Sequence, residues 1–424
     1  MVKKFIFLSA IYFFIFFISI SYPCNKQRKD SVNIHTSTNS MLNVFLDCNR
    51  CNFKIIQSKV PFVNYVRDPN QAQIHVLITR QSTASGGYIY NLQFIGLGKY
   101  HNQDQNLSYS SLQSDTDVER QEGIAKILTF GLLRYVAQTG IVNNINISFD
   151  NENINNLPQQ IKDPWDHWIF DIRLKGGLES EENNSSARLE GSINGNRVTE
   201  DWRFRNGFDY VFKEENFKDS SGTIISTVKS WDGKSSIVKS FSSHWSAGAF
   251  VDLHSSTYKN INLDYSIYPG IEYNIFPWSD VSRKILTFGY YLGYKNFNYI
   301  NKTIFDKLNE SLLFHSARVE ADIKEPWGDF YGLLDFSQYP NLNKKYKISM
   351  EAFLDIRLTE GLSLSLDFQG ESIHNQIYLP RGVASLEEIL LKQRQLQTSY
   401  TFQSSVGIKY TFGSIYNNII NIRM

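Results

Sequence analysis

The most constraining feature of the sequence is an alternation of apolar and polar residues that begins at Trp168 and recurs as far as residue 412. In one stretch, Leu362, Leu364, Leu366 and Phe368 are separated by serine and aspartate residues. Successive side chains of a β-strand point to opposite faces, so this period of two predicts strands that are apolar on one face only. A soluble β-sandwich also alternates, but rarely over so many long strands with charges throughout the polar face.

The alternating segments predict twelve strands, an even number as in bacterial outer-membrane barrels. The predicted ranges are 167–178, 184–195, 200–214, 221–241, 244–257, 261–276, 284–299, 312–324, 328–338, 344–358, 361–377 and 398–412. After the N-terminal 23 residues no run of 18 apolar residues occurs, which argues against transmembrane helices. A closed barrel satisfies its backbone hydrogen bonds without helices, so we expect a transmembrane antiparallel β-barrel over residues 165–413. An aromatic content of 14% with only 42% hydrophobic residues fits this expectation.

The connections between these strands alternate between short and long, which predicts short periplasmic turns and long external loops. Tryptophans cluster near the short turns, where their rings would form a membrane girdle at the lipid headgroups. The predicted girdle residues are Trp165, Trp168, Trp202, Trp245, Trp278 and Trp327, with Trp231 as the exception.

The last strand carries the pattern Ser405, Gly407, Tyr410 and Phe412. This pattern resembles the terminal assembly signal that the barrel-assembly machinery reads, although residues 414–424 follow it here as a periplasmic C-terminal tail. The expected partners of the barrel are therefore outer-membrane lipid and the barrel-assembly machinery.

The N-terminus reads as a signal peptide over residues 1–23, with Lys3 and Lys4 preceding the apolar stretch 5–21. A transmembrane anchor is the alternative. Lipidation of Cys24 also stays open, although Tyr22 and Pro23 are poor residues before a lipidated cysteine. Residues 24–40 are polar and are interpreted as a flexible leader.

Residues 41–142 predict a small α+β periplasmic domain, joined to the barrel by an Asn-rich linker at 143–164. Strands are expected at 42–47, 72–79, 87–97 and 107–111, with helices near 53–57 and over 116–138. Thr116 and Glu119 have the spacing of a capping box. Cys48 and Cys51 form a possible disulfide; unpaired thiols and a redox pair are the alternatives.

The net charge of +1 gives no reason to expect a nucleic-acid partner. Charges of both signs fall on the polar face of the predicted strands. They form either a salt-bridged interior or a water-filled path for a polar solute. These lumen-facing candidates are Arg173, Arg188, Glu190, Arg203, Arg205, Asp209, Asp252, Asp264, Glu272, Arg318, Glu320, Asp322, Glu351, Asp355, Arg357 and Asp367.

No Walker A, H-E-x-x-H, G-x-S-x-G or calcium-loop motif occurs, so no catalytic residue, cofactor or metal is predicted. One enzyme alternative rests on His254 and Ser256, which have the His-x-Ser spacing of outer-membrane phospholipases. The chain departs from that pattern because Thr257 and Tyr258 follow, and the alternation turns His254 inward.

The segments FLDCNRCNF, FVNYVRDPNQAQIHVLIT, IEYNIFPWS, KEPWGDF and YTFGSIYNNIIN resemble uncharacterised outer-membrane β-barrel proteins of the Bacteroidota that carry an N-terminal periplasmic domain. The resemblance spans residues 42–424 and implies the same two-part architecture without an activity. The leading expectation is a porin-like channel or solute-uptake barrel that its periplasmic domain gates. A separate hypothesis is that the long loop 372–397, with a helix at Leu386–Leu396, folds into the mouth and closes it. The alternatives are a structural or assembly component that docks a periplasmic protein partner, and an outer-membrane lipid hydrolase.

Overall fold

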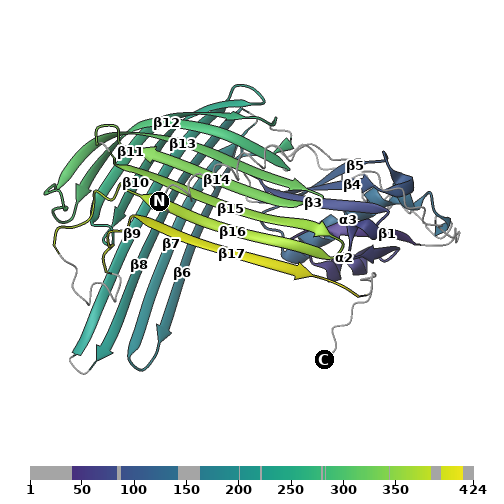
Figure 1. The fold of residues 1–424 in the computed structure, drawn as a ribbon, viewed down its shortest axis with the longest axis horizontal. Helices are drawn as coiled ribbons and strands as arrows, with labels where there is room; N and C mark the ends of the chain where they lie inside the picture. Colours follow the sequence, from purple (N-terminus) through teal and green to yellow (C-terminus); the bar gives the residue numbers. More distant parts are fainter. Residues whose placement is uncertain are drawn as a thin grey trace, which may run out of the picture. The chain divides into compact units, whose positions relative to one another are not determined.

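The computed structural model describes residues 41–83, 87–141, 163–199, 201–219, 222–277, 280–281, 283–342, 344–382 and 393–413. The predicted signal peptide, the leader, the C-terminal tail, nearly all of the linker and Trp278 lie outside these ranges. Residues Met41–Met424 form one compact unit. It contains a five-stranded sheet and a twelve-stranded sheet (Figure 1).

The five-stranded sheet has the strand order β2-β1-β3-β4-β5. Strand β1 pairs parallel with both β2 and β3, whereas β3, β4 and β5 are antiparallel neighbours. The elements of this α+β region are β1 (Leu42–Asp47), α2 (Phe53–Lys59), β2 (Val63–Val66), the 3-10 turn η2 (Pro69–Gln71), β3 (Ile74–Ser82), β4 (Tyr88–Gly96), the 3-10 turn η3 (Gly98–Tyr100), β5 (Gln105–Ser111) and α3 (Asp117–Val136).

Helix α3 covers the core of this region. Ile124, Leu128 and Leu132 are completely buried and pack in one cluster with apolar side chains of β1, β3 and β4. The helix approaches β4 closely at Gly131, where an added Cβ atom would lie 2.0 Å from the ring of Phe94. Any larger residue at position 131 would therefore push α3 away from the sheet.

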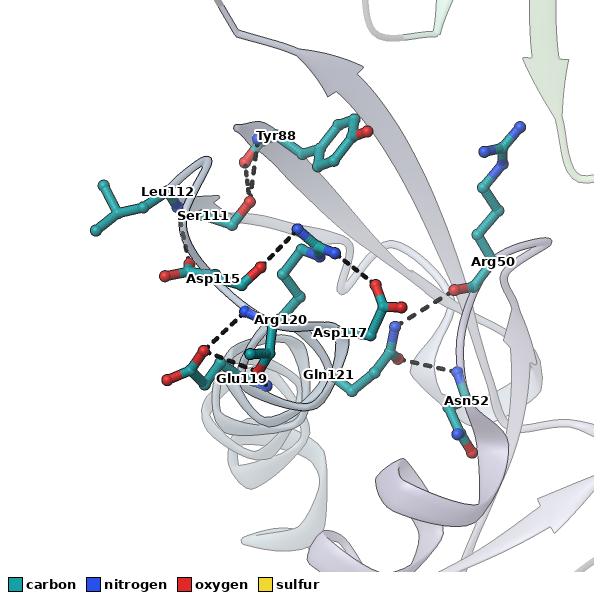
Figure 2. Close-up of polar contacts among 11 residues, drawn as sticks. Arg50, Asn52, Tyr88, Ser111, Leu112, Asp115, Asp117, Glu119, Arg120 and Gln121 are labelled. Atoms are coloured by element: carbon teal, nitrogen blue, oxygen red, sulfur yellow. Dashed lines mark hydrogen bonds and ion pairs between the residues drawn. The ribbon is translucent and has the colours of Figure 1, made fainter. Parts of the chain in front are cut away.

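The N-terminus of α3 is held by the predicted capping box, which Figure 2 shows. The Oγ1 atom of Thr116 accepts a bond of 3.3 Å from the backbone N–H of Glu119. The carboxylate of Glu119 in turn accepts a bond of 2.7 Å from the backbone N–H of Thr116. Arg120 also donates to the backbone oxygen of Asp115 over 2.8 Å, so the first turn of α3 is tied to the loop before it.

The twelve-stranded sheet is an antiparallel meander in which every strand pairs with its neighbours in sequence. The predicted fold class, about twelve antiparallel strands after a small α+β domain, is confirmed. The strands are β6 (Trp168–Ser180), β7 (Asn184–Val198), β8 (Trp202–Asp219), β9 (Gly222–Ser240), β10 (Trp245–Ser256), β11 (Ile261–Asn274), β12 (Lys284–Tyr299), β13 (Asn309–Glu325), β14 (Gly328–Gln338), β15 (Tyr346–Thr359), β16 (Leu362–Ile373) and β17 (Tyr400–Tyr410).

The sheet is strongly curved, as Figure 1 shows, and its strand order begins with β6 and ends with β17. These two strands are its edges, and nearly all their residues are exposed. The turns at one end are tight: Gly361, with φ +69°, connects β15 to β16 in a conformation that glycine adopts without strain.

Several elements differ from the sequence prediction, most of all β2, β8 and β16. Strand β8 runs to Asp219 rather than to residue 214. Strand β2, only four residues long, was not predicted. Strand β16 ends at Ile373 rather than at residue 377, because residues 374–381 leave the sheet and pack elsewhere, as described below. None of the helices in the described ranges is long and apolar enough to cross a membrane.

Candidate functional site

The two faces of the twelve-stranded sheet differ sharply in chemistry. Along β12, Phe288, Tyr290 and Leu292 expose 44%, 49% and 53% of their surface. The residues between them point to the opposite face, because side chains alternate along a strand. We call the first face the apolar face and the second the charged face. Such a continuous exposed apolar surface would be unfavourable in water and suits contact with lipid.

The strand register places all sixteen predicted lumen-facing residues on the charged face. Arg318 lies opposite Asp335, for example, and Glu351 lies opposite Leu333, both on ladders that join this face from β13 to β15. The sixteen residues come from eight strands: β6 (Arg173), β7 (Arg188, Glu190), β8 (Arg203, Arg205, Asp209), β10 (Asp252), β11 (Asp264, Glu272), β13 (Arg318, Glu320, Asp322), β15 (Glu351, Asp355, Arg357) and β16 (Asp367).

Ion pairs join neighbouring strands across this face. The guanidinium of Arg318 donates to both carboxylate oxygens of Asp335 over 2.7 and 3.2 Å. The ammonium of Lys295 lies 3.0 Å from the carboxylate of Asp264, which is only 2% exposed. The charged face therefore carries charges of both signs, and some of them pair between neighbouring strands.

His254 takes part in a further pair, since its Nδ1 atom lies 2.8 Å from the carboxylate of Asp232. The described residues offer no hydrogen-bond partner to its buried Nε2 atom. Ser256, on the same face, accepts a bond from the backbone N–H of Lys259. His254 thus bonds to a carboxylate on β9, and no bond to Ser256 is seen among the described contacts.

Two adjoining cavities lie on the charged face. Their volumes are about 280 and 350 Å³, and both are lined by Asp252, Lys295, Tyr339 and Asn375. The first cavity reaches His254 and Lys259, and the second reaches the Arg318–Asp335 pair. Together they offer space for a small polar molecule, at the low end of the size range of ligand pockets.

A segment between β16 and β17, residues 374–381, borders these cavities; we call it the mouth segment. Its Asn375 lines both cavities and its Tyr378 lines the first. Ile377, 1% exposed, packs in an apolar cluster with residues of β11, β12 and β13, including Ile261 and Phe297. The mouth segment also forms a β-bridge between Pro380 and Thr303 of the β12–β13 connection.

Asn260 fixes the mouth segment to two other connections. Its side-chain amide donates to the backbone oxygens of Tyr378, over 3.0 Å, and of Asn301, over 2.9 Å. Its side-chain oxygen accepts a bond of 2.8 Å from the N–H of Asn301. Asn260 is 3% exposed and has φ +61°, a conformation that asparagine tolerates better than most residues. The predicted loop 372–397 therefore does pack over the cavities in its described part, although residues 393–396, predicted as helical, are not helical.

Most of the tryptophans lie at the end of the sheet opposite the mouth segment, where strands begin or turn. Trp168, Trp202 and Trp245 begin β6, β8 and β10, Trp327 lies in the β13–β14 turn, and Trp165 precedes β6. Trp168 and Trp202 stack on Phe170 and Phe204, and Trp245 contacts Tyr273. Trp231 lies in the middle of β9.

The other predicted sequence signals are also located. In the last strand, Ser405, Gly407 and Tyr410 lie in β17, and the ring of Phe412 stacks on that of Tyr410. Cys48 and Cys51 are joined by a disulfide in the loop after β1. No group of three or more residues that could hold a metal ion occurs within the ranges described.

Several charged-face residues around the cavities were missed by the sequence prediction: Asp232, Lys234, Lys259, Lys295, Tyr339 and Asp335. In β9 the apolar face carries Trp231, Gly233 and Ser235, so the hydrophobic alternation that reveals parity is weak there. Ile225 and Ile237 lie on the apolar face, and each is an odd number of positions from Asp232. Counting alternate positions from them would have assigned Asp232 to the charged face.

Comparison with known proteins finds similarity to a protein family and to solved structures. Residues 176–376 are similar to the family described as "Protein of unknown function, DUF481", a range that runs from β6 to just beyond β16. A solved structure titled "NanC porin structure in rhombohedral crystal form" aligns with 57% of this chain and 100% of its own, with 10% identity and a TM-score of 0.28. A similarity this weak gives no basis for assigning any property of the porin to this chain. No curated protein matches the chain.

Proposed function

We propose that this chain is an outer-membrane barrel whose charged face lines a path for polar solutes, with the mouth segment restricting that path. The apolar face supports a lipid environment, because Phe288, Tyr290 and Leu292 are exposed on it. An unpaired strand edge is costly in lipid, so we infer that β6 and β17 pair in the membrane and close the sheet. In this arrangement the α+β region lies in the periplasm.

The observation that carries the proposal is the pair of cavities on the charged face, bordered by the mouth segment. A barrel interior filled only to hold the wall together would leave no such space. The packing of Ile377 and the bonds of Asn260 keep the mouth segment against the cavities. The described structure therefore corresponds to a restricted form of the path.

The charges around the cavities indicate the kind of solute. Arg318 with Asp335 and Lys295 with Asp264 neutralise each other, so neither cations nor anions are strongly favoured. His254 and Lys259 line the first cavity, so polar side chains are present there to recognise a hydrogen-bonding solute. We expect a polar solute of low net charge.

The test is single-channel conductance of the purified full-length protein in a planar bilayer. A folded wild-type protein is expected to give short, infrequent openings with weak ion selectivity. A variant that lacks residues 374–381 is expected to conduct steadily. If the folded variant lacking this segment were as silent as the wild type, the proposal of a solute path would be wrong.

A second candidate is a structural or assembly component that docks a periplasmic partner. It is favoured by Leu112, Val118 and Phe130 of the α+β region, which expose 66%, 53% and 53% of their surface. Co-purification of a protein that is lost when these three residues are changed to serine would support it. Retention of that protein by the triple variant would argue against it.

A further inference from the structure

A cluster of polar contacts links the loop after β1 to the turns of the twelve-stranded sheet. Arg357, in β15, donates from Nη1 and Nη2 to the two carboxylate oxygens of Asp47 over 2.8 and 2.7 Å. Its Nη1 atom also donates to the backbone oxygen of Pro326 over 2.6 Å. The guanidinium lies 5.2 Å from the centroid of the Phe45 ring, within the range of a cation–π interaction.

Asp47 is almost enclosed by this arrangement. It is 9% exposed, and its second partner, the Nε2 atom of His75, lies 3.1 Å away and belongs to a residue that is 2% exposed. A buried carboxylate without a charged partner is strongly unfavourable. Asp47 therefore depends on Arg357, a residue 310 positions away in the chain.

Three further bonds reach the same two turns of the sheet. Asn49 donates to the carboxylate of Asp329 over 2.7 Å, at the β13–β14 turn. At the β15–β16 turn, the N–H of Gly361 donates to Asp68 over 2.7 Å. Gln71 bonds to Glu360 at the same turn. The polar contacts of the α+β region named here thus fall on Asp329, Arg357, Glu360 and Gly361.

Residues 47–52, which begin at the last residue of β1 and supply Asp47 and Asn49, are themselves firmly held. The disulfide between Cys48 and Cys51 closes it. Figure 2 shows that Gln121 of α3 bonds to it twice: its side chain accepts from the N–H of Asn52 over 2.9 Å and donates to the oxygen of Arg50 over 3.3 Å. The side chain of Asn52 also caps α2 by accepting from the N–H groups of Lys54 and Ile55.

We propose that residues 47–52 are a preorganised docking loop that fixes the α+β region to the β13–β14 and β15–β16 turns, with the Asp47–Arg357 pair as its principal contact. A loop ordered before contact loses little entropy on docking, so a small set of polar bonds is sufficient to hold it. The α+β region is then a fixed support at the end of the sheet where these two turns lie. It does not work as a gate that swings away from the turns.

The test is a cross-link within the full-length protein. A Cys24→Ser background carries Gln71→Cys and Glu360→Cys, which lie at a contact remote from the native disulfide. A short bifunctional thiol reagent is expected to join them in high yield, seen as a mobility shift on denaturing gels. Adding Arg357→Ala is expected to lower the initial cross-linking rate by about tenfold or more, because Asp47 loses its charged partner.

The matched control is Arg318→Ala, which removes another bidentate arginine–carboxylate pair of the same sheet but touches no docking residue. It should leave the cross-linking rate unchanged. Replacing both Cys48 and Cys51 by serine should lower the rate, since the loop loses its closure. If Arg357→Ala prevents assembly, Asp47→Asn makes the same test from the other side.

Absence of the cross-link in the folded background would overturn the proposal. So would an undiminished rate in both the Arg357→Ala and the Asp47→Asn variants. An undiminished rate in the Cys48→Ser, Cys51→Ser protein would remove the disulfide from the proposal and leave Gln121 as the support of the loop.

Discussion

Replacing Asn260 by alanine is expected to release the mouth segment from the cavities. The change removes two donated bonds and one accepted bond, to Tyr378 and Asn301, each worth about 1 kcal/mol. It also places an alanine at φ +61°, at a cost of about 1 kcal/mol. Only the bond to Tyr378 joins Asn260 to the mouth segment, so the restricted form loses about 1 kcal/mol directly, roughly a fivefold shift in the equilibrium. The lost bonds to Asn301 and the backbone strain add to this by loosening the β12–β13 connection, which forms a bridge to Pro380.

The restricted form retains other contacts, chiefly the buried Ile377 and the bridge between Thr303 and Pro380. The Asn260→Ala variant should therefore still close, but its openings in a planar bilayer should be several times more frequent. A second readout is trypsin cleavage after Arg381 in the folded protein. The N–H of Arg381 bonds to the oxygen of Lys302, so release of the segment should accelerate this cleavage.

Asn260→Gly separates the two contributions to the effect. Glycine adopts a positive φ without strain, so this variant loses the three bonds but keeps the backbone conformation. Its opening frequency should lie between those of the wild type and the alanine variant. If the folded Asn260→Ala protein matched the wild type in both conductance and trypsin sensitivity, the reasoning about the mouth segment would be refuted.

Three other outcomes are expected. Leu128→Ala should destabilise the α+β region by about 2–5 kcal/mol, because Leu128 is completely buried; urea unfolding followed by helical circular dichroism measures this, and a loss below 1 kcal/mol would contradict the packing. Burial alone would raise the pKa of Asp47, but hydrogen bonds and charge attraction from His75 and Arg357 outweigh it and lower that pKa. The stabilisation from Asp47 is therefore complete above the pKa of the unfolded carboxyl, about 4, and is lost as pH falls through the lower folded value; the difference in urea stability between the wild type and Asp47→Asn should shrink only below about pH 4, and a loss near pH 6 would assign it to another group. Single cysteines at Ile172 in β6 and at alternate apolar-face positions of β17 should form a disulfide in at least one combination in membranes; failure of all combinations would mean that the sheet stays open.

The strands and the two faces of the large sheet can largely be predicted from the sequence, because residues at alternate positions along a strand point to opposite faces. The range 284–299 was predicted for β12 and agrees with its observed bounds, since aromatic and aliphatic residues mark every second position. The capping box of α3 is equally local, because Thr116 and Glu119 are three residues apart.

Contacts between residues far apart in the chain could not be predicted from the alternation of residues or from local motifs. The sequence predicts that Asp264 lies on the charged face, but its pairing with Lys295 follows from the register between β11 and β12. Strand β2 exists because four residues pair with β1, which sequence alternation over so short a stretch does not reveal. The Asp47–Arg357 contact depends on the fold of both regions.

The pairing of charges on neighbouring strands has a consequence for how the barrel is put together. His254 and Asp232 lie directly opposite each other on β10 and β9, as do Arg318 and Asp335 on β13 and β14. If a strand slipped by one residue during insertion, its charged side chains would turn toward the hydrocarbon and leave their partners behind. An arginine facing lipid near the bilayer midplane raises the free energy by about 2–4 kcal/mol. A strand in the wrong register would carry this penalty at several of its charged residues. The ion pairs between neighbouring strands would therefore favour the correct register at each step of insertion, before the barrel is complete.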